Sequence, residues 1–351
     1  MQGSERFLAA CRRMPVDCTP VWFMRQAGRY QAAYQAIRAK HTLLEIIASA
    51  ELSAKVTMIP IDQMPVDAAI IFADILPPLV PMGMDLEFVK GEGPVLHNPI
   101  SSPSDIDALR PYDPATKLSS TMGALKMVQD HLNGRAALIG FAGGPFTLAS
   151  YMIEGGSSRN YVKAKQLMYC EPAAWNVLMD KLGQLTADYL LAQIQAGAQC
   201  VQLFDSWAGA LSPHDYRRFV LPTTRSIIDR IHAESDVPVI HFGVNTSGML
   251  DQIAAAGSDV VGVDWRIPLG RAWETIGHDR AVQGNLDPIR LFDSGESLQA
   301  AIQSILDEAA GQPGHIFNLG HGIVPNTPEE TVRQVAELVH TLSAREANEG
   351  E

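Results

Sequence analysis

The stretch "EPAAWNVLMDKLGQLTADYLLAQIQAGAQCVQLF", residues 171–204, joins a helix pattern directly to a strand pattern. Its apolar side chains recur at spacings of three and four, as on one face of a helix: Trp175, Leu178, Leu182, Leu185 and Tyr189. Gly197 stands where a helix commonly ends, and the run "QCVQLF" that follows is short and apolar. A helix followed at once by a buried strand is the unit from which parallel sheets are built.

Eight such strand-like runs occur along the chain. They are "PVWF" (20–23), "DAAIIF" (67–72), "AALIGF" (136–141), "QCVQLF" (199–204), "VPVIHF" (237–242), "DVVGVD" (259–264), "AVQGN" (281–285) and "HIFNLG" (315–320). Helix-like segments lie between them, including residues 42–59, 212–234 and 295–311. Eight alternating strands and helices predict an α/β fold, the (β/α)8 TIM barrel, with its active-site cleft at the C-terminal ends of the strands. An open doubly wound sheet normally has a glycine-rich phosphate turn after its first strand, and this sequence has no such turn.

No linker, repeat or low-complexity tract divides the 351 residues. The Pro/Ser-rich piece "HNPISSPSDIDALRPYDP", residues 97–114, is interpreted as a surface connection. We therefore predict one TIM-barrel domain over residues 1–351, in which about 342–351 form a frayed polar tail.

Composition restricts the class of protein. The chain is 46% hydrophobic and 19% charged, which is typical of a soluble protein with a large core. A net charge of -12 and a pI near 5.3 argue against binding to nucleic acid or to an anionic membrane. No signal peptide or membrane-spanning stretch is recognisable. The four cysteines are scattered without a CxxC pair, which is typical of reduced thiols in the cytoplasm.

Polar residues follow the strand-like runs, where a barrel enzyme carries its active site. The candidates are Asp74, Tyr151, Ser206 and His321. Each also has a purely structural interpretation. Asp74 could cap a turn before Pro77, His321 could belong to a tight glycine turn, and Tyr151 could be a core residue. Asp205 and Ser206 could cap the helix that starts near residue 212. The segment "GFAGGPF" (140–146) could bind phosphate through its backbone, although close packing explains its glycines better.

The arginines near the N-terminus are harder to explain structurally. From Cys18 to Leu44 there is no Asp or Glu, yet Arg25 and Arg29 stand four residues apart. One turn of helix would put both on the same face, where they repel each other. Either a distant carboxylate such as Asp17 or Glu45 balances them, or a ligand with several carboxylates does.

Six motifs in order resemble the uroporphyrinogen decarboxylase family. The two signatures stand as "PVWFMRQAGRY" (20–30) and "GFAGGPFTLASYMIEGG" (140–156). The other four are "AAIIFADIL" (68–76), "QLFDSWAG" (202–209), "GNLDP" (284–288) and "NLGHGIVPNTP" (318–328). The resemblance covers essentially the whole chain.

This resemblance implies a cytoplasmic homodimer of single-domain TIM barrels that uses no cofactor and no metal. It implies the conversion of uroporphyrinogen III to coproporphyrinogen III, in which four acetate side chains become methyls and carbon dioxide leaves. The implied catalytic residues are Asp74, Arg25 and Arg29. The implied substrate-binding residues are Arg25, Gln26, Ala27, Gly28, Arg29, Asp74, Tyr151, Ser206 and His321.

Residue chemistry agrees with that reaction. A protonated pyrrole ring is its own electron sink, and a carboxylate such as Asp74 would stabilise the resulting cation. The arginines would hold the substrate carboxylates.

Two other functions remain to be considered. A zinc-dependent methyltransferase of the same barrel superfamily, acting on corrinoid-bound or thiol methyl groups, would need a His-x-Cys pair in the fifth run. Gly243 stands at the cysteine position. A non-catalytic tetrapyrrole carrier would need the arginines but not Asp74.

Overall fold

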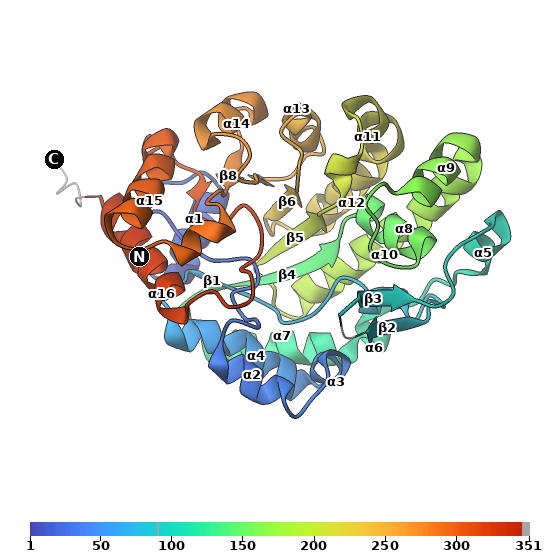
Figure 1. Cartoon of the computed structure of the whole chain (residues 1–351), viewed down its shortest axis with the longest axis horizontal. Coiled ribbons are helices and arrows are strands. Elements are labelled where there is room, and N and C mark those ends of the chain that lie inside the picture. Colours follow the sequence, from blue (N-terminus) through green and yellow to red (C-terminus); the bar gives the residue numbers. More distant parts are fainter. Residues whose placement is uncertain (90, 346–351) are drawn as a thin grey trace.

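A parallel sheet of seven strands forms the centre of the protein in a computed structural model that describes residues 1–89 and 91–345. The strands are β1 (Ala68–Ile70), β4 (Ala137–Gly143), β5 (Cys200–Asp205), β6 (Val239–Gly243), β7 (Val260–Gly262), β8 (Ala281–Gln283) and β9 (His315–Ile316). Each pairs in parallel with the next one in the chain. The sheet curls inside a layer of helices, as Figure 1 shows, so the predicted barrel fold is confirmed with seven strands.

The first predicted run, "PVWF", is reduced to a single parallel bridge between Val21 and Phe317 beyond β9. On its other side the Val21 carbonyl accepts the N–H of Asp67, which stands just before β1. The segment thus occupies the eighth position between β9 and β1. It is not a regular strand because side chains take its N–H groups: Val21 donates to Asp67, Phe23 to Gln26, and Met24 to Asn318.

Asp67 holds this closure together. Its side chain is 1% exposed and accepts three bonds, from the Val21 N–H (2.7 Å), from Arg6 (2.6 Å) and from His340 (2.7 Å). Arg6 belongs to the first helix and His340 to the last, so one buried carboxylate joins both ends of the chain to β1. A buried charge is tolerated only when it is paired in this way.

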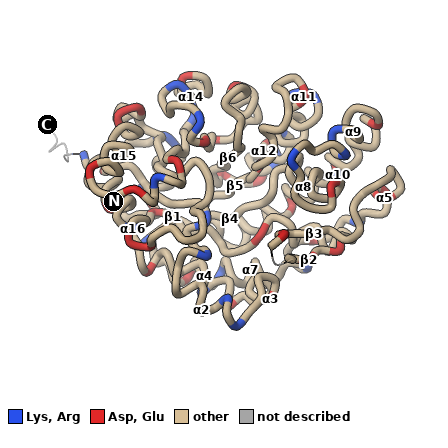
Figure 2. The backbone as a smooth tube through the Cα atoms, in the orientation of Figure 1, with Lys and Arg blue, Asp and Glu red and all other residues tan. Residues whose placement is uncertain are grey.

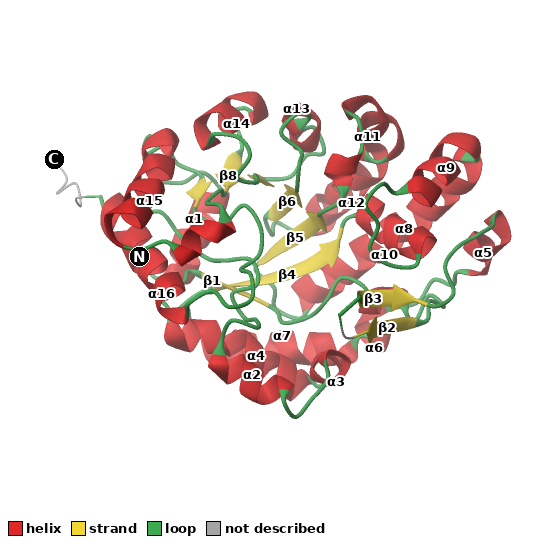
Figure 3. Ribbon diagram, in the orientation of Figure 1, coloured by secondary structure: helices red, strands yellow, loops and turns green. Residues whose placement is uncertain are grey.

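Helices surround the sheet (Figure 3). They are α1 (Gly3–Cys11), α2 (Ala32–Arg38), α3 (Leu43–Ala48), α4 (Ala50–Gln63), α5 (Pro103–Ala108), α6 (Pro114–Lys117), α7 (Ser119–Leu132), α8 (Pro145–Glu154), α9 (Val162–Cys170), α10 (Pro172–Gln195), α11 (Pro213–Phe219), α12 (Leu221–Glu234), α13 (Leu250–Ala254), α14 (Leu269–Ile276), α15 (Gly295–Ala309) and α16 (Glu329–Ser343). Three 3-10 turns complete them, η1 (Pro77–Leu79), η2 (Ala208–Ala210) and η3 (Pro288–Phe292).

Two of the predicted helix-like segments are each divided in two. Residues 42–59 break at Ser49, whose backbone is extended and whose side chain accepts the Leu52 N–H as the cap of α4. Residues 212–234 break at Val220, because Pro222 stands in the first turn of α12 and cannot continue the preceding helix. The long segment 171–197 is one helix, α10, followed by Gly197 at φ +112° as predicted.

The region between β1 and β4 holds elements that the patterns did not predict. An antiparallel hairpin of β2 (Leu86–Val89) and β3 (Gly93–Leu96) stands apart from the barrel sheet. The surface connection at 97–114 includes the short helix α5, which starts at Pro103 after Ser102.

The two ends of the barrel differ in their surroundings. Phe7, Ala10 and Cys11 of α1 belong to the same buried cluster as Ala137 and Cys200, the first residues of β4 and β5. The N-terminal ends of the strands are therefore covered by α1. The C-terminal ends form the opposite rim, which we call the mouth.

At the C-terminus, α16 ends at Ser343, and the Arg345 N–H bonds to the carbonyl of Asp17. Residues 346–351 of the predicted polar tail lie outside the described residues. Charges of both signs are interspersed over the helices, without a large basic face in the view of Figure 2. None of the helices described is both long and apolar enough to cross a membrane.

Candidate active site

Aromatic side chains form the floor of the mouth. Phe141, Phe204 and Phe242 stand near the C-terminal ends of β4, β5 and β6, at positions that alternate into the barrel interior. Their rings meet edge to face at centroid distances of 5.4 and 6.0 Å, and Phe242 meets the ring of His321 at 6.4 Å. The sequence interpretation missed this row, although three aromatic residues at the ends of successive strand runs are a visible signal. The floor suits a flat apolar face.

The segment that carries Arg25 and Arg29 is a series of turns and not the helical turn considered from the sequence. Arg25 has φ +62°, in the left-handed region, which interrupts any helix. Its side chain crosses closely over Gly322, where an added Cβ would lie 2.5 Å from the Arg25 Cδ. Gly322 thus gives Arg25 its path to the mouth beside His321.

Both arginines are exposed, and neither forms an ion pair within residues 1–89 and 91–345. The distant carboxylates considered as partners are used elsewhere. Asp17 pairs with Arg6, and Glu45 caps α3 through Thr42. Arg25 thus has no ion-pair partner among the described residues, which leaves its guanidinium available to an acidic ligand.

The residues between the two arginines hold the loop in shape. Gln26 is 1% exposed, and its amide bonds the Phe23 N–H and the carbonyl of Ala68 in β1. Ala27 and Gly28 are partly buried, and a Cβ at Gly28 would lie 2.9 Å from the Arg25 carbonyl. The side chain of Gln26 therefore acts on the backbone of the loop, which positions Arg25.

Asp74 stands on the loop after β1 and is partly buried. One oxygen accepts the Leu76 N–H at 3.0 Å, so the turn-capping role foreseen for it exists. Burial raises the pKa of Asp74, whereas the bond from Leu76 and the charge of Arg25 oppose that rise. The positive charge of Arg25 is therefore near enough to favour the ionised form of Asp74.

Tyr151 projects from α8 and is partly buried. Its ring stacks on Trp207 with centroids 4.0 Å apart, and Tyr161 packs on the same indole at 5.1 Å. Burial and the charge of Asp74 raise the pKa of Tyr151, so it remains a neutral hydroxyl next to that carboxylate. Trp207 was not predicted as a site residue.

Ser206 lies between Asp205, the last residue of β5, and Trp207. Neither Asp205 nor Ser206 caps the helix near residue 212, because Ser212 itself accepts the Asp215 N–H there. Asp205 instead accepts bonds from Thr147 at the start of α8.

His321 follows β9, and its Nδ1 accepts the Gly322 N–H at 2.6 Å. Burial, with the charges of Arg25 and Arg266, lowers the pKa of His321 to about 4. The ring is therefore neutral at pH 7 and, with Nδ1 as an acceptor, carries its proton on Nε2.

His321 binds a proton less readily in the folded protein than in the unfolded one, so its protonation in acid should destabilise the fold. The unfolded side chain binds its proton near pH 6.5 and the folded one near pH 4, so stability is lost as the pH falls between these values. We expect a His321→Gln variant to lose about 1–2 kcal/mol less than the wild type between pH 7 and pH 5. Urea denaturation at the two pH values measures this difference, and parallel pH curves for the two proteins would contradict it.

The structure thus brings Arg25, Asp74, Tyr151 and His321 into one mouth, with Ser206 beside the Tyr151–Trp207 stack. Arg29 is not among the groups whose charges act on Asp74, Tyr151 or His321; its charge acts on Tyr34 of α2 instead. Arg266 was not singled out in the sequence. It pairs with Asp264 at 2.9 Å, lies over the ring of Trp265 and adds positive charge near His321.

No three His, Cys, Asp or Glu side chains of the described residues are placed to hold a metal ion together. His241 of β6 is fully buried, and strand alternation turns it away from the interior residues Ile240 and Phe242. It faces the helix layer, where the backbone of Ile253 approaches it. The one histidine of the fifth run therefore does not point into the mouth.

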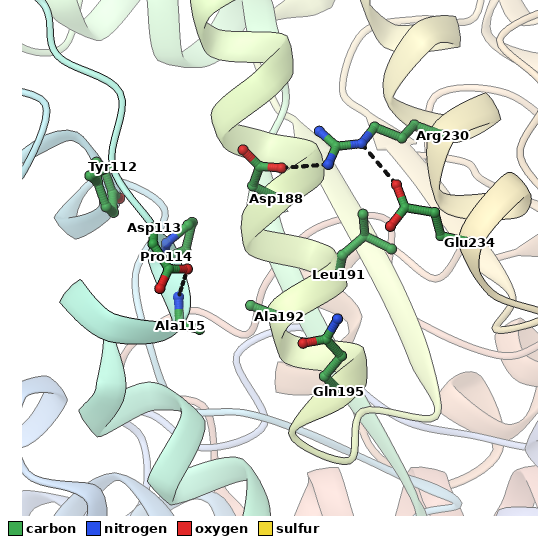
Figure 4. A pocket seen from close by; sticks show the side chains of 10 residues that line it. All are labelled: Tyr112, Asp113, Pro114, Ala115, Asp188, Leu191, Ala192, Gln195, Arg230 and Glu234. Carbon is green, nitrogen blue, oxygen red and sulfur yellow. Dashed lines mark hydrogen bonds and ion pairs between the residues drawn. The ribbon is translucent and has the colours of Figure 1, made fainter.

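A hollow outside the barrel has no part in this arrangement. Figure 4 shows it between α10, α12 and the start of α6, lined by Asp113, Gln195 and other residues. Its one arginine, Arg230, is paired with Asp188 at 2.6 Å and with Glu234 at 3.1 Å. It contains none of the predicted site residues.

An α/β barrel whose open end gathers an unpaired arginine, a carboxylate, a tyrosine and a neutral histidine above an aromatic floor belongs to the class of barrel enzymes. Comparison with known proteins identifies the family. The family model of uroporphyrinogen decarboxylase (URO-D) matches residues 2–342. The chain belongs to the uroporphyrinogen decarboxylase family.

Curated relatives agree. The chain is 55% identical over 344 residues to a uroporphyrinogen decarboxylase of Roseiflexus sp. (strain RS-1), covering 97% of this chain and 99% of the relative. It is 50% identical to that of Carboxydothermus hydrogenoformans, covering 97% of each. Among solved structures, a methyltransferase from Methanosarcina mazei superposes with a TM-score of 0.82 at 19% identity over 97% of this chain and 98% of the other. That distant likeness supports the barrel fold alone.

Proposed function

We propose that this protein is a carboxy-lyase that converts uroporphyrinogen III to coproporphyrinogen III in tetrapyrrole (haem and chlorophyll) biosynthesis. Family membership supports the proposal. The observation that carries it is that Arg25, which forms no ion pair among the described residues, and the partly buried Asp74 are near each other, since the charge of Arg25 acts on that carboxyl. A macrocycle with carboxylates at its edge and pyrrole N–H groups at its centre requires both signs of charge at once.

The reaction needs no cofactor because the pyrrole accepts the electrons. A proton adds to a ring carbon and makes the ring cationic. The bond between the acetate methylene and its carboxylate then breaks, carbon dioxide leaves, and the bonding electrons neutralise the ring. The exocyclic methylene that remains is then protonated to a methyl and the ring carbon releases its added proton, so each decarboxylation consumes one proton overall. Four such steps convert the four acetates.

The acidic, basic and neutral residues of the site have different roles in this reaction. Asp74 accepts the pyrrole N–H groups and stabilises the cation, a form of preorganised electrostatic catalysis. Arg25 and Arg29 hold acetate and propionate groups at the rim, and one of them relays a proton. Tyr151, Ser206 and His321 orient the ring through hydrogen bonds. Gln26, Ala27 and Gly28 contribute through the shape of the arginine loop.

Incubating the purified protein anaerobically with uroporphyrinogen, followed by chromatography of the oxidised products, tests the function. Four-carboxylate product is expected. Eight-carboxylate material that is bound but unchanged would instead support a non-catalytic tetrapyrrole carrier. The zinc-dependent methyltransferase is disfavoured, since His241 faces the helices and Gly243 offers no ligand.

We also propose a domain organisation, an oligomeric state and a compartment for the protein. We place one barrel domain over residues 1–351, in a homodimer in the cytoplasm. The four free cysteines, three of them buried, are compatible with a reducing compartment. Light scattering coupled to size-exclusion chromatography tests the dimer, for which a mass near twice 38.1 kDa is expected.

A further inference from the structure

A buried polar chain joins the end of β5 to the start of α8 directly behind the mouth. Asp205, the last residue of β5, is 0% exposed. Its Oδ1 accepts the Thr147 N–H at 3.1 Å and the Thr147 hydroxyl at 2.7 Å. Its Oδ2 has no hydrogen-bond partner among the described residues. A fully buried carboxylate without a cation needs a reason, because such a group is costly to bury.

The first bond gives α8 a cap from another element. Gly144 stands at the cap position of α8 and has no side chain that could accept an N–H. A Cβ at Gly144 would lie 2.5 Å from the Asp205 Cβ, so the glycine makes room for the aspartate. Asp205 thus takes the place of the usual capping residue, and the positive end of the helix favours its negative charge.

The second bond has a different consequence. Because the Thr147 hydroxyl donates its only hydrogen to Asp205, its lone pairs remain available as acceptors. The Trp207 N–H donates to that same oxygen at 3.2 Å. Ser206 is therefore held on both sides, by Asp205 and by Trp207.

This polar chain ends at a predicted substrate-binding residue. The Trp207 indole stacks on the ring of Tyr151 at 4.0 Å and 29°. Tyr151 stands one helical turn after Thr147 on α8. Helix α8 therefore contacts Trp207 twice, by the hydrogen bond from the Trp207 N–H to Thr147 and by the stack of Tyr151 on the indole.

We propose that Asp205 and Thr147 are positioning residues: the carboxylate orients the threonine hydroxyl to hold the Trp207 backbone, which places Ser206 and the Trp207–Tyr151 stack for the substrate. The proposal rests on the proposed function. Burial raises the pKa of Asp205 to about 6, in keeping with a carboxylate used to order its surroundings and not to form an ion pair.

Thr147→Val separates this role from helix capping. Valine has nearly the same shape and keeps the backbone N–H that bonds to Asp205, so the cap of α8 survives while the acceptor for Trp207 is lost. We expect kcat/KM for uroporphyrinogen to fall roughly 10- to 100-fold, because small misplacements of binding groups have effects of that size. Thr147→Ser and Asp205→Asn keep the required acceptors and should remain within about threefold of the wild type.

Two further measurements make the test specific. Thr224→Val is the matched control, since Thr224 is also buried and its hydroxyl donates to the carbonyl of Val220, the cap residue of its own helix α12, away from the mouth; it should leave kcat/KM unchanged. The fluorescence of Trp207 is obtained for each protein as the difference between its spectrum and that of the same protein with the added change Trp207→Phe. In Thr147→Val, acrylamide should quench the Trp207 fluorescence about twofold more strongly, as expected for an indole that no longer stacks on Tyr151.

Each outcome has a definite meaning. A Thr147→Val enzyme with wild-type kcat/KM overturns the proposal, and so does a loss of activity with an unchanged Trp207 signal. If the wild type does not decarboxylate uroporphyrinogen at all, the proposed function fails. The fluorescence comparison then still decides whether Thr147 holds Trp207.

Discussion

Asp74→Asn is expected to reduce turnover of uroporphyrinogen about 10²-fold or more, the scale of losing one preorganised charge-stabilising group. The asparagine keeps an oxygen at the position that accepts the Leu76 N–H, so the turn survives. It removes only the negative charge next to Arg25. Steady-state rates under anaerobic conditions, with substrate binding measured separately, show whether the loss falls on kcat.

Asp113→Asn is the matched control for this change. Asp113 also stands two residues before the N–H that it accepts, that of Ala115, and it also precedes a turn with proline. It lies beside the outer hollow of Figure 4 and not at the mouth. Its variant should have wild-type turnover. Wild-type turnover in Asp74→Asn as well would mean that Asp74 only caps its turn.

Asp67→Ala is expected to destabilise the fold by about 3–5 kcal/mol, because it removes a buried carboxylate on which three separate donors converge; Arg6 keeps only its half-exposed partner Asp17. The same change removes the acceptors for His340 and for the Val21 N–H, which hold the last helix and the eighth barrel position. Chemical denaturation monitored by far-ultraviolet circular dichroism measures the loss.

Asp62→Ala provides the contrast. Asp62 pairs with Arg135 at 2.9 Å, but both side chains are about half exposed. Such surface pairs contribute about 0–1 kcal/mol, so this variant should be nearly as stable as the wild type. Equal losses of unfolding free energy in the two variants would show that the buried Asp67 contributes no more stability than a surface ion pair.

Local patterns predicted most of the barrel. Seven of the eight strand-like runs are strands in the predicted order, and α10 ends before Gly197 as its spacing indicated. The patterns did not show where helices break, because Ser49 and Pro222 lie inside continuous apolar periodicities. They also did not show that the run "PVWF" lacks a ladder. Its N–H groups bond to side chains from distant parts of the chain, which no local window contains.

For the site, residue types pointed to Asp74, Tyr151, Ser206 and His321 because each follows a strand run. The spacing of Arg25 and Arg29 did not predict their separate surroundings, since Arg25 has a left-handed backbone and its side chain passes over Gly322, which is distant in the sequence. Trp207 and Asp205 stand beside Ser206 in one motif, yet their roles depend on α8. The outward orientation of His241 likewise became clear only from the two sides of β6.

By itself the sequence determined the barrel class, the family motifs and the types of charge at the strand ends, because these follow from hydrophobic periodicity and residue chemistry. The tertiary structure decided which charges meet. Asp67 gathers both chain ends, Arg25 approaches Asp74 and His321 without a partner of its own among the described residues, and Asp205 caps a helix to which it is not adjacent in sequence. Burial and long-range hydrogen bonds determine these contacts, and both arise only when the whole chain has folded.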